Sequence, residues 1–284
     1  MSDWWRKERS KMLVLIKGAG DLASGVAYRC FRSGFSVAMT EIAQPTVVRR
    51  AVAFAEAVYE KEVSIEGVKA CLARNPREAK GLLSKRIIPV LIDPSAVETI
   101  RELSPRVIVD AIMAKKNLGT FRGQAPLVIG LGPGFTAGKD VDVVIETLRG
   151  HYLGRVLYQG QAIANTGIPG EIQGYGKERV LRAPGKGSFR ALRRIGDLVQ
   201  AGETVGYVGS TPVKTVLAGV LRGLLRDGLE VEPGMKIGDV DSRARVEYCF
   251  SISEKALAIG GGVLEAILYH EYLTGRKGGG EKDE

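Results

Sequence analysis

Short apolar runs alternate with stretches of helical periodicity through the first half of the chain. Runs made mostly of Val, Ile and Leu, which are typical of strands buried on both faces, lie at 12–16, 35–40, 87–92, 107–112, 127–131 and 141–147. Helical spacing of apolar residues predicts helices at 22–33, at 47–59 and, after the start signal Asp93-Pro94, up to Leu103. Because strands that alternate with helices form parallel sheets, we expect an α/β domain with a mostly parallel sheet over residues 12–150.

The pattern changes near residue 150, where short β-type runs separated by glycine replace the helical periodicity. Residues 196–205 read G-x-x-V-x-x-G-x-x-V, and residues 228–237 repeat this spacing with a final Ile. We expect two similar β-hairpin units packed face to face, with the glycines in turns that need positive φ and the Val and Ile side chains in a shared core. The sequence thus predicts a β-rich domain at 151–243.

A C-terminal helical segment is expected at 244–275. Its helix, at 255–272, has an apolar face and is predicted to return to the first domain and cover its sheet. The tail from Gly275 to Glu284 consists of glycine and charged residues, and we expect it to fray.

The turn after the first predicted strand gives the clearest chemical signal. Gly18, Gly20 and Ala23 fit the pattern G-x-G-x-x-[GA] between a strand and a helix. The first glycine allows the tight turn, the second lets a phosphate approach the backbone, and the small alanine lets the helix pack closely. The amides at the helix start, around Asp21 and Leu22, favour an anion, although the Asp21 carboxylate repels one. We therefore expect a Rossmann-type ligand site; the alternative is that the glycines only allow close packing.

Two further segments leave predicted strand ends, where ligands of open α/β sheets bind. Glu41 follows the second strand and can bind the ribose hydroxyls of a dinucleotide. Lys115, Lys116 and Asn117 can hold an anionic head group, or they form only a solvated loop.

A second glycine-rich loop follows the strand at 127–131. It is not a Walker A loop, because five residues separate Gly132 from Gly138 where that motif has four. It still presents backbone amides that can bind an anion, at Gly132, Gly134, Phe135 and Thr136. The alternative is a long structural turn.

Charge and composition narrow the class of partner. The 284 residues carry a net charge of +9, from 41 Lys and Arg against 32 Asp and Glu, which favours phosphate-bearing partners. Basic patches interleaved with aromatic residues are absent, so nucleic acid is not expected. No apolar run approaches the roughly 20 residues needed to cross a bilayer, and the charged start resembles no signal peptide. We expect no membrane partner and a cytoplasmic location.

Cysteine and histidine usage limits the available chemistry. The three cysteines, Cys30, Cys71 and Cys249, form no Cys-x-x-Cys pair, which favours a reducing compartment. Two histidines are too few for a multi-histidine site, and no metal site is expected. Cys249 lies between apolar residues with no histidine near it, so it is only a weak catalytic candidate. The sequence identifies no catalytic residue.

Several long strings resemble one family. They lie at 18–25, 114–120, 130–138, 145–155, 165–170, 234–241 and 259–266. Together they resemble the YqeB-type accessory proteins of selenium-dependent molybdenum hydroxylases, over residues 12–269. The N-terminal half is more distantly similar to the xanthine dehydrogenase accessory (XdhC) family, and the repeat region resembles the barrel-sandwich hybrid fold of lipoyl and biotinyl domains. Because the Met-Lys-Met tip of those carriers is absent around Lys214, we expect no lipoyl or biotinyl group there.

The resemblance implies a role in maturation. Such a protein would bind and handle the molybdenum cofactor (molybdopterin) or an NAD(P)-like nucleotide, with the selenium-dependent molybdenum hydroxylase as its client. Cys249 or Cys30 would be the candidate for transient transfer of sulfur or selenium, and a homodimer is left open. The alternatives are an NAD(P)-dependent oxidoreductase, which needs a proton donor that the sequence does not display, and a non-catalytic ligand-sensing module. Whether the chain is an enzyme is left open.

Overall fold

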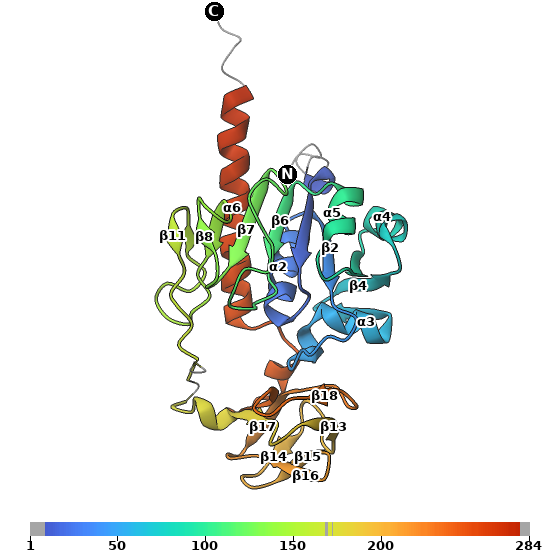
Figure 1. Cartoon of the computed structure of the whole chain (residues 1–284), viewed down its shortest axis with the longest axis vertical. Coiled ribbons are helices and arrows are strands. Elements are labelled where there is room, and N and C mark those ends of the chain that lie inside the picture. The colour runs from blue at the N-terminus through green and yellow to red at the C-terminus, as the bar shows by residue number, and fades with distance from the viewer. Residues whose placement is uncertain (1–8, 168–169, 172, 279–284) are drawn as a thin grey trace, which may run out of the picture.

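The computed structural model describes residues 9–167, 170–171 and 173–278. Its N-terminal part is built on a nine-stranded sheet with the order β10-β9-β7-β6-β1-β2-β5-β4-β3 (Figure 1). These strands are β1 (Leu13–Lys17), β2 (Ser36–Glu41), β3 (Glu62–Ile65), β4 (Val68–Ala73), β5 (Ile88–Ile92), β6 (Val107–Asp110), β7 (Leu127–Leu131), β9 (Val143–Ile145) and β10 (Val156–Leu157). The six strands predicted in this half all exist, within a few residues of their expected bounds.

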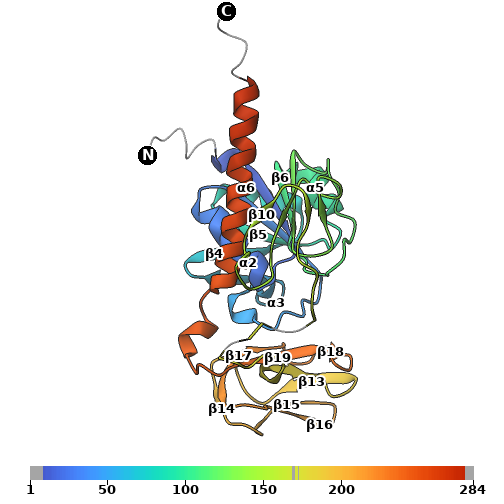
Figure 2. The same ribbon diagram turned by 90° about the vertical axis from the view of Figure 1, so that its left-hand side faces the viewer.

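Helices cover the two faces of this sheet unequally. Side chains alternate along β1, so that Val14 and Ile16 pack under α2 (Asp21–Arg32) and α6 (Glu254–Gly278). Leu13 and Leu15 face the opposite side, toward α4 (Pro76–Ser84) and α5 (Val97–Leu103). Figure 2 shows α6 running along α2 and past β10, and α6 is in contact with both of them. The last helix therefore covers the sheet that the first elements build.

The fold-class prediction of a Rossmann-type sheet is wrong. β3 and β10 pair antiparallel at the two edges, so the sheet is mixed. A doubly wound fold carries a helix in each crossover, but the chain between β6 and β7 and between β7 and β9 contains none. In place of crossover helices, the chain forms the short ladder of β8 (Thr136–Ala137) with β11 (Gly160–Gln161) and a small apolar cluster around Phe135. On the other face, α6 packs against β7 and β9.

The prediction of a single helix at 47–59 is also wrong. The segment instead forms η1 (Arg50–Val52), η2 (Phe54–Glu56) and α3 (Ala57–Glu60). Its backbone groups have partners outside a helix: the Val48 carbonyl accepts a hydrogen bond from Leu224 N at 2.9 Å, and Ala55 N donates to Ala19 O at 2.9 Å. Contacts distant in sequence thus break the helical repeat, and the segment becomes the junction between the two parts of the chain.

The second part contains two four-stranded antiparallel sheets, with the orders β12-β19-β17-β14 and β16-β15-β13-β18. Their strands are β12 (Val180–Arg182), β13 (Gly187–Ala191), β14 (Leu198–Val199), β15 (Thr204–Val208), β16 (Thr211–Lys214), β17 (Gly219–Leu224), β18 (Glu230–Val231) and β19 (Lys236–Asp241). A short η3 (Lys177–Arg179) precedes them, and η4 (Val246–Cys249) leads into α6. β10 and β11, although they follow residue 150, pair with β9 and β8 of the first part.

The internal repeat is confirmed in its residues but not in its hairpins. The four repeat glycines have φ between +77° and +100°, and the apolar repeat positions Val199, Val205, Val231 and Ile237 are all buried in one core. However, β14 pairs with β17 in one sheet while β15 lies in the other, and β18 and β19 are separated in the same way. Each repeat therefore crosses between the sheets. The prediction of two hairpins packed face to face is therefore wrong, and so is the barrel-sandwich hybrid fold that the resemblance to lipoyl and biotinyl domains implied.

Among the described residues, no helix is both long enough and apolar enough to span a membrane.

Candidate functional site

A cavity of about 960 Å³ lies between the carboxyl edge of the large sheet and the β-rich part. One wall comes from the turn after β1 and from the segments that follow β2, β6, β7 and β9. The other comes from Arg222 on β17, from Lys236 and Asp239 on β19, and from the start of α6. The carboxyl edge of parallel strands is where α/β sheets bind ligands, and the volume lies in the range of small-molecule sites. This cavity is the candidate site.

The structure brings some of the predicted residues to this cavity and leaves others outside it. The lining includes Gly18, Gly20, Asp21, Leu22, Ala23, Glu41, Lys115 and Phe135. It does not include Lys116, Asn117, Gly132, Gly134 or Thr136.

The two glycines of the first turn have different roles. Gly18 has φ +89°, and a Cβ there would lie 3.0 Å from the Ala111 carbonyl oxygen, so this glycine is needed by the backbone. Gly20 has no positive φ, and a Cβ there would meet only Val47 Cγ2, at 3.8 Å. Gly20 therefore opens onto the cavity. It is also the N-cap of α2 and provides no side-chain cap, which leaves the first amides of α2 available to an anion.

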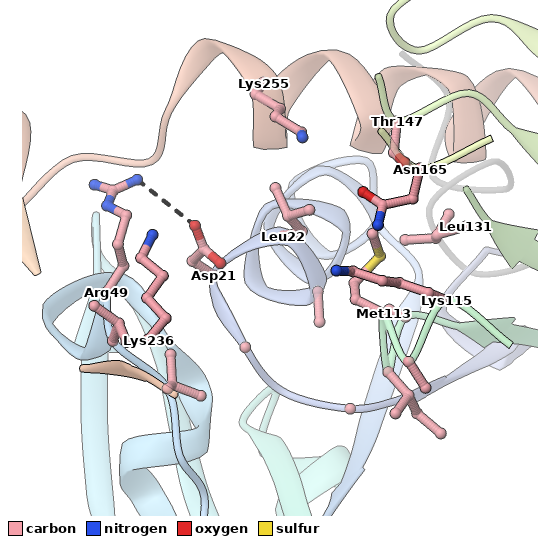
Figure 3. A pocket seen from close by; sticks show the side chains of 18 of the residues that line it. Asp21, Leu22, Arg49, Met113, Lys115, Leu131, Thr147, Asn165, Lys236 and Lys255 are labelled. Atoms are coloured by element: carbon pink, nitrogen blue, oxygen red, sulfur yellow. Dashed lines mark ion pairs between the residues drawn. The ribbon is translucent and has the colours of Figure 1, made fainter. Parts of the chain in front are cut away.

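Glu41 is occupied by the protein itself. Its carboxylate accepts hydrogen bonds from Ala19 N and from Ile42 N, both at 2.8 Å. It thus closes the glycine turn and engages one of the amides that a dinucleotide phosphate would approach. The repulsion predicted from Asp21 is reduced, because Arg49 Nη1 lies 3.8 Å from its Oδ2 (Figure 3).

The Lys115–Asn117 loop is held by a buried polar group that the sequence analysis missed. Lys17 Nζ donates to Thr120 Oγ1 at 2.6 Å, and this hydroxyl donates to Asp110 Oδ2 at 2.6 Å. All three residues are at most 2% exposed. Asn117 accepts hydrogen bonds from the Thr120 and Gly119 amides, so it shapes the loop rather than binding a ligand. Lys115 is the member of this loop that lines the cavity.

The second glycine-rich loop supports the cavity mainly through packing. A Cβ on Gly134 would lie 2.8 Å from the backbone of Lys116, so this glycine lets the two loops touch, and Gly132 packs against Thr147. Thr136 N donates to Asp140, and its hydroxyl accepts from Gln161. Two residues of the loop reach the cavity, Pro133 and Phe135, and Phe135 is buried over Gly130. These contacts favour the alternative interpretation of this loop, a long structural turn.

Most of the positive charge of the cavity comes from residues that sequence reasoning did not single out. Seven cationic side chains line it against three carboxylates. Besides Lys115, the cations are Arg49, Arg149, Arg179, Arg222, Lys236 and Lys255. They come from both parts of the chain and share no motif. The only signal in the sequence is the net charge of +9.

Burial disfavours the charged form of two of these side chains, Lys255 and Arg222. The pKa of Lys255 is lowered, first by burial and then by the nearby charge of Arg149. The pKa of Arg222 is lowered by burial and then by the charge of Arg49. A cavity that holds partly desolvated like charges attracts an anion, which would relieve both effects.

The cysteines proposed as sulfur or selenium carriers lie outside the cavity. Cys30 and Cys249 are fully buried, and neither lines the cavity. Burial raises the pKa of the Cys30 thiol to about 12 and also raises the pKa of Cys249. Among the residues that the structure describes, no three or more His, Cys, Asp and Glu side chains are grouped to hold a metal ion.

Thiol titration should therefore modify about one thiol per native chain, namely Cys71, because it is the one of the three that is not fully buried. Burial and the nearby Glu62 carboxylate raise the pKa of Cys71, so its reaction should become faster as the pH rises. Unfolding in denaturant should release the remaining two. An aromatic disulfide reagent followed by absorbance measures both stages, and Cys71→Ser should remove the native-state reaction. Rapid modification of Cys249 in the folded chain would show that this thiol is exposed, and would restore it as a carrier candidate.

Comparison with known proteins identifies a sequence relative. No protein-family model matches the chain. A protein of Escherichia coli (strain K12) with the name "Uncharacterized protein YqeB" is 52% identical over 256 residues, which cover 90% of this chain and 47% of that protein. The chain thus spans about half the length of this relative.

Solved structures give weaker likenesses. TcdA (CsdL) is 14% identical and aligns with 46% of this chain and 53% of its own, with a TM-score of 0.30. An aspartoacylase family protein from Mesorhizobium loti and a succinylglutamatedesuccinylase/aspartoacylase from Rhodobacter sphaeroides are 10% and 13% identical, align with 81% of this chain and 84% of theirs, and have TM-scores of 0.27. The predicted resemblance to YqeB-type proteins is confirmed over 90% of the chain.

Proposed function

We propose that the chain binds a phosphate-bearing cofactor in the cavity and acts as an accessory protein in the maturation of a selenium-dependent molybdenum hydroxylase. The favoured ligand is the molybdenum cofactor, whose pterin carries a phosphate. The observation that carries the proposal is the uncapped start of α2, which opens into a cavity lined by seven cations and three carboxylates. A phosphate at the start of a helix is stabilised by the free amides and by the helix dipole.

The remaining lining suits the body of such a ligand. Apolar side chains of Leu22, Met113, Leu131, Phe135 and Ile163 line the cavity and can cover a flat ring system. Figure 3 shows Met113 and Leu131 beside Leu22 at the start of α2, with Lys115 pointing toward the same space. A site with apolar walls and a few fixed polar groups is typical of cofactor binding. The client enzyme is inferred from the resemblance to YqeB-type accessory proteins.

The NAD(P)-dependent alternative is disfavoured by two observations. Glu41, the expected ribose ligand, is already engaged by the amides of Ala19 and Ile42. In the described part of the chain, the cavity lining contains no His or Tyr side chain, so neither a histidine donor nor the Tyr of a Tyr-x-x-x-Lys pair is present there. A purely ligand-sensing module would use the same cavity but would bind no hydroxylase, which co-purification with that enzyme tests.

A Gly20→Val variant should lower the affinity for molybdenum cofactor by roughly 10–100-fold, because its side chain would cover the first amides of α2. The fold should tolerate the change, since the first added carbon meets only Val47. Anaerobic titration with cofactor released from a donor enzyme, followed by pterin fluorescence, measures the affinity. NADH serves as the competing ligand.

Gly81→Val is the matched control, because Gly81 lies on α4 with open space around it. This control should bind the cofactor as the wild type does. Unchanged binding by Gly20→Val would remove the start of α2 from the site. Tighter binding of NADH than of the cofactor would favour the oxidoreductase.

A further inference from the structure

A second group of cations lies on the β-rich side of the cavity, facing the start of α2. Arg222 lies on β17 and Lys236 on β19, and Arg49 and Lys255 come from the junction segment and from the start of α6. Figure 3 shows Arg49 and Lys236 on one side of Asp21, and Lys255 reaching from α6 toward Leu22 at the start of α2. A single phosphate at the start of α2 would leave most of this charge without a counter-charge.

Two of these cations are buried arginines whose donors are not all used. Arg49 is 9% exposed and Arg222 is 6% exposed. Arg49 donates to the carbonyls of Tyr248 and Ser251, at 3.0 and 3.2 Å. In both arginines the Nε–H group is buried and has no hydrogen-bond partner. Buried donors are almost always paired in proteins, so the unused Nε–H group of each arginine marks a guanidinium that lacks one acceptor.

The carboxylates nearby are shared among too many cations to supply that acceptor. Asp241 Oδ2 lies 3.3 Å from Arg222 and 2.6 Å from Arg243. Asp239 Oδ1 lies 2.5 Å from Arg179 and 3.6 Å from Lys236. Asp21 is 3.8 Å from Arg49. With Lys255, six cations thus share these three aspartates, together with the charges of Glu254 near Arg222 and of Glu146 near Lys255. Uncompensated charge at low exposure is unfavourable, and an anion would remove this imbalance.

We propose that Arg49, Arg222, Lys236 and Lys255 form a second anion subsite, so that the ligand carries at least two anionic groups of the diphosphate class. One group binds at the start of α2 and the other binds to the β-rich part, so the ligand joins the two parts of the chain. The inference rests on the cavity of the proposed function, but not on the identity of the cofactor.

Inorganic phosphate and inorganic pyrophosphate are the probes, titrated into the full chain by calorimetry at low salt. Pyrophosphate should bind about tenfold or more tightly than phosphate, because two charge-assisted sites are engaged at once. Lys236→Met and Arg222→Met should remove most of this difference and change phosphate binding less than about threefold. ADP distinguishes a nucleoside diphosphate from free diphosphate as the source of the group.

Lys214→Met is the matched control, since Lys214 is exposed on β16 of the same part and does not line the cavity. It should leave both affinities unchanged. Equal affinity for the two probes, or an equal loss in Lys214→Met and Lys236→Met, would overturn the second subsite. The failures are distinguishable: pyrophosphate selectivity without binding of molybdenum cofactor would contradict the proposed function alone. Cofactor binding without that selectivity would contradict the subsite alone.

Discussion

Replacing Asp110 by alanine is expected to lower the free energy of unfolding by about 3–5 kcal/mol, which is typical of removing one partner of a buried ion pair. Asp110 is 2% exposed, and its Oδ2 lies 3.8 Å from Lys17 Nζ and accepts the Thr120 hydroxyl at 2.6 Å. Without this carboxylate, the Lys17 ammonium keeps only the Thr120 hydroxyl as a partner. The charge would then be left buried, without a counter-charge, at the ends of β1 and β6.

Urea denaturation followed by circular dichroism measures this change. Glu102→Ala is the control, because Glu102 forms an ion pair with Arg101 on the surface, and such a pair contributes less than about 1 kcal/mol. Asp110→Asn should fall between the two variants, since the amide oxygen can still accept the Thr120 hydroxyl. An Asp110→Ala chain as stable as the Glu102→Ala chain would show that Lys17 is compensated by some other group.

The loss should also reach the candidate site. The Lys17–Thr120–Asp110 group joins the ends of β1 and β6 to the loop that carries Lys115 into the cavity. Asp110 Oδ1 also accepts from Ile112 N at 3.2 Å, at the start of the same loop. A destabilised loop would no longer hold Lys115 in place. Weaker phosphate binding in Asp110→Asn, measured well below its unfolding transition, would report this coupling.

The sequence predicted the part of the site that is local in the chain. The turn from Gly18 to Ala23 could be recognised because its strand, glycines and helix are consecutive, and it does line the cavity. Arg49, Arg222 and Lys255 could not be found in this way. Each lies on a different element, and only the packing of the β-rich part against the sheet edge brings them together.

The errors in the fold have the same origin. The apolar spacing at 47–59 is compatible with a helix, but Arg50 Nε donates to the Leu224 carbonyl, and the Val48 carbonyl accepts from Leu224 N. Tertiary contacts therefore overrode a local preference. The same holds for the crossover from β6 to β7, where a helix was not needed because α6, far away in sequence, covers one face.

In the internal repeat, the sequence spacing predicts the turns and the buried positions but not which strands pair. Positive φ at Gly202 and Gly234, and burial of Val205 and Ile237, follow from spacing alone. The choice of strand partner does not, because a glycine turn can return a strand to its own sheet or pass it to the opposite one. β14 and β15 take the second course. Only the cross-strand contacts of the folded chain decide between the two.

The contact between α2 and α6 should tolerate no side chain at Gly25. A Cβ there would lie 2.6 Å from Ala256 Cβ and 2.7 Å from the Ala256 carbonyl oxygen. Because backbone cannot move aside as a flexible side chain can, Gly25→Ala is expected to lower the free energy of unfolding by about 3 kcal/mol. Denaturant unfolding measures the loss. Anion binding should weaken as well, since Ser253 and Lys255 at the start of α6 line the cavity.

Gly81→Ala provides a control with the same chemistry and the opposite sign. Gly81 is also helical, on α4, but a Cβ there would meet nothing within 4 Å. Alanine loses less conformational entropy than glycine when a helix forms, so this variant should gain about 0.5–1 kcal/mol. If both variants shift stability in the same direction and by a similar amount, α6 does not pack against α2 as closely as the structure has it. Ser253 and Lys255, at the start of α6, would then not line the cavity as described.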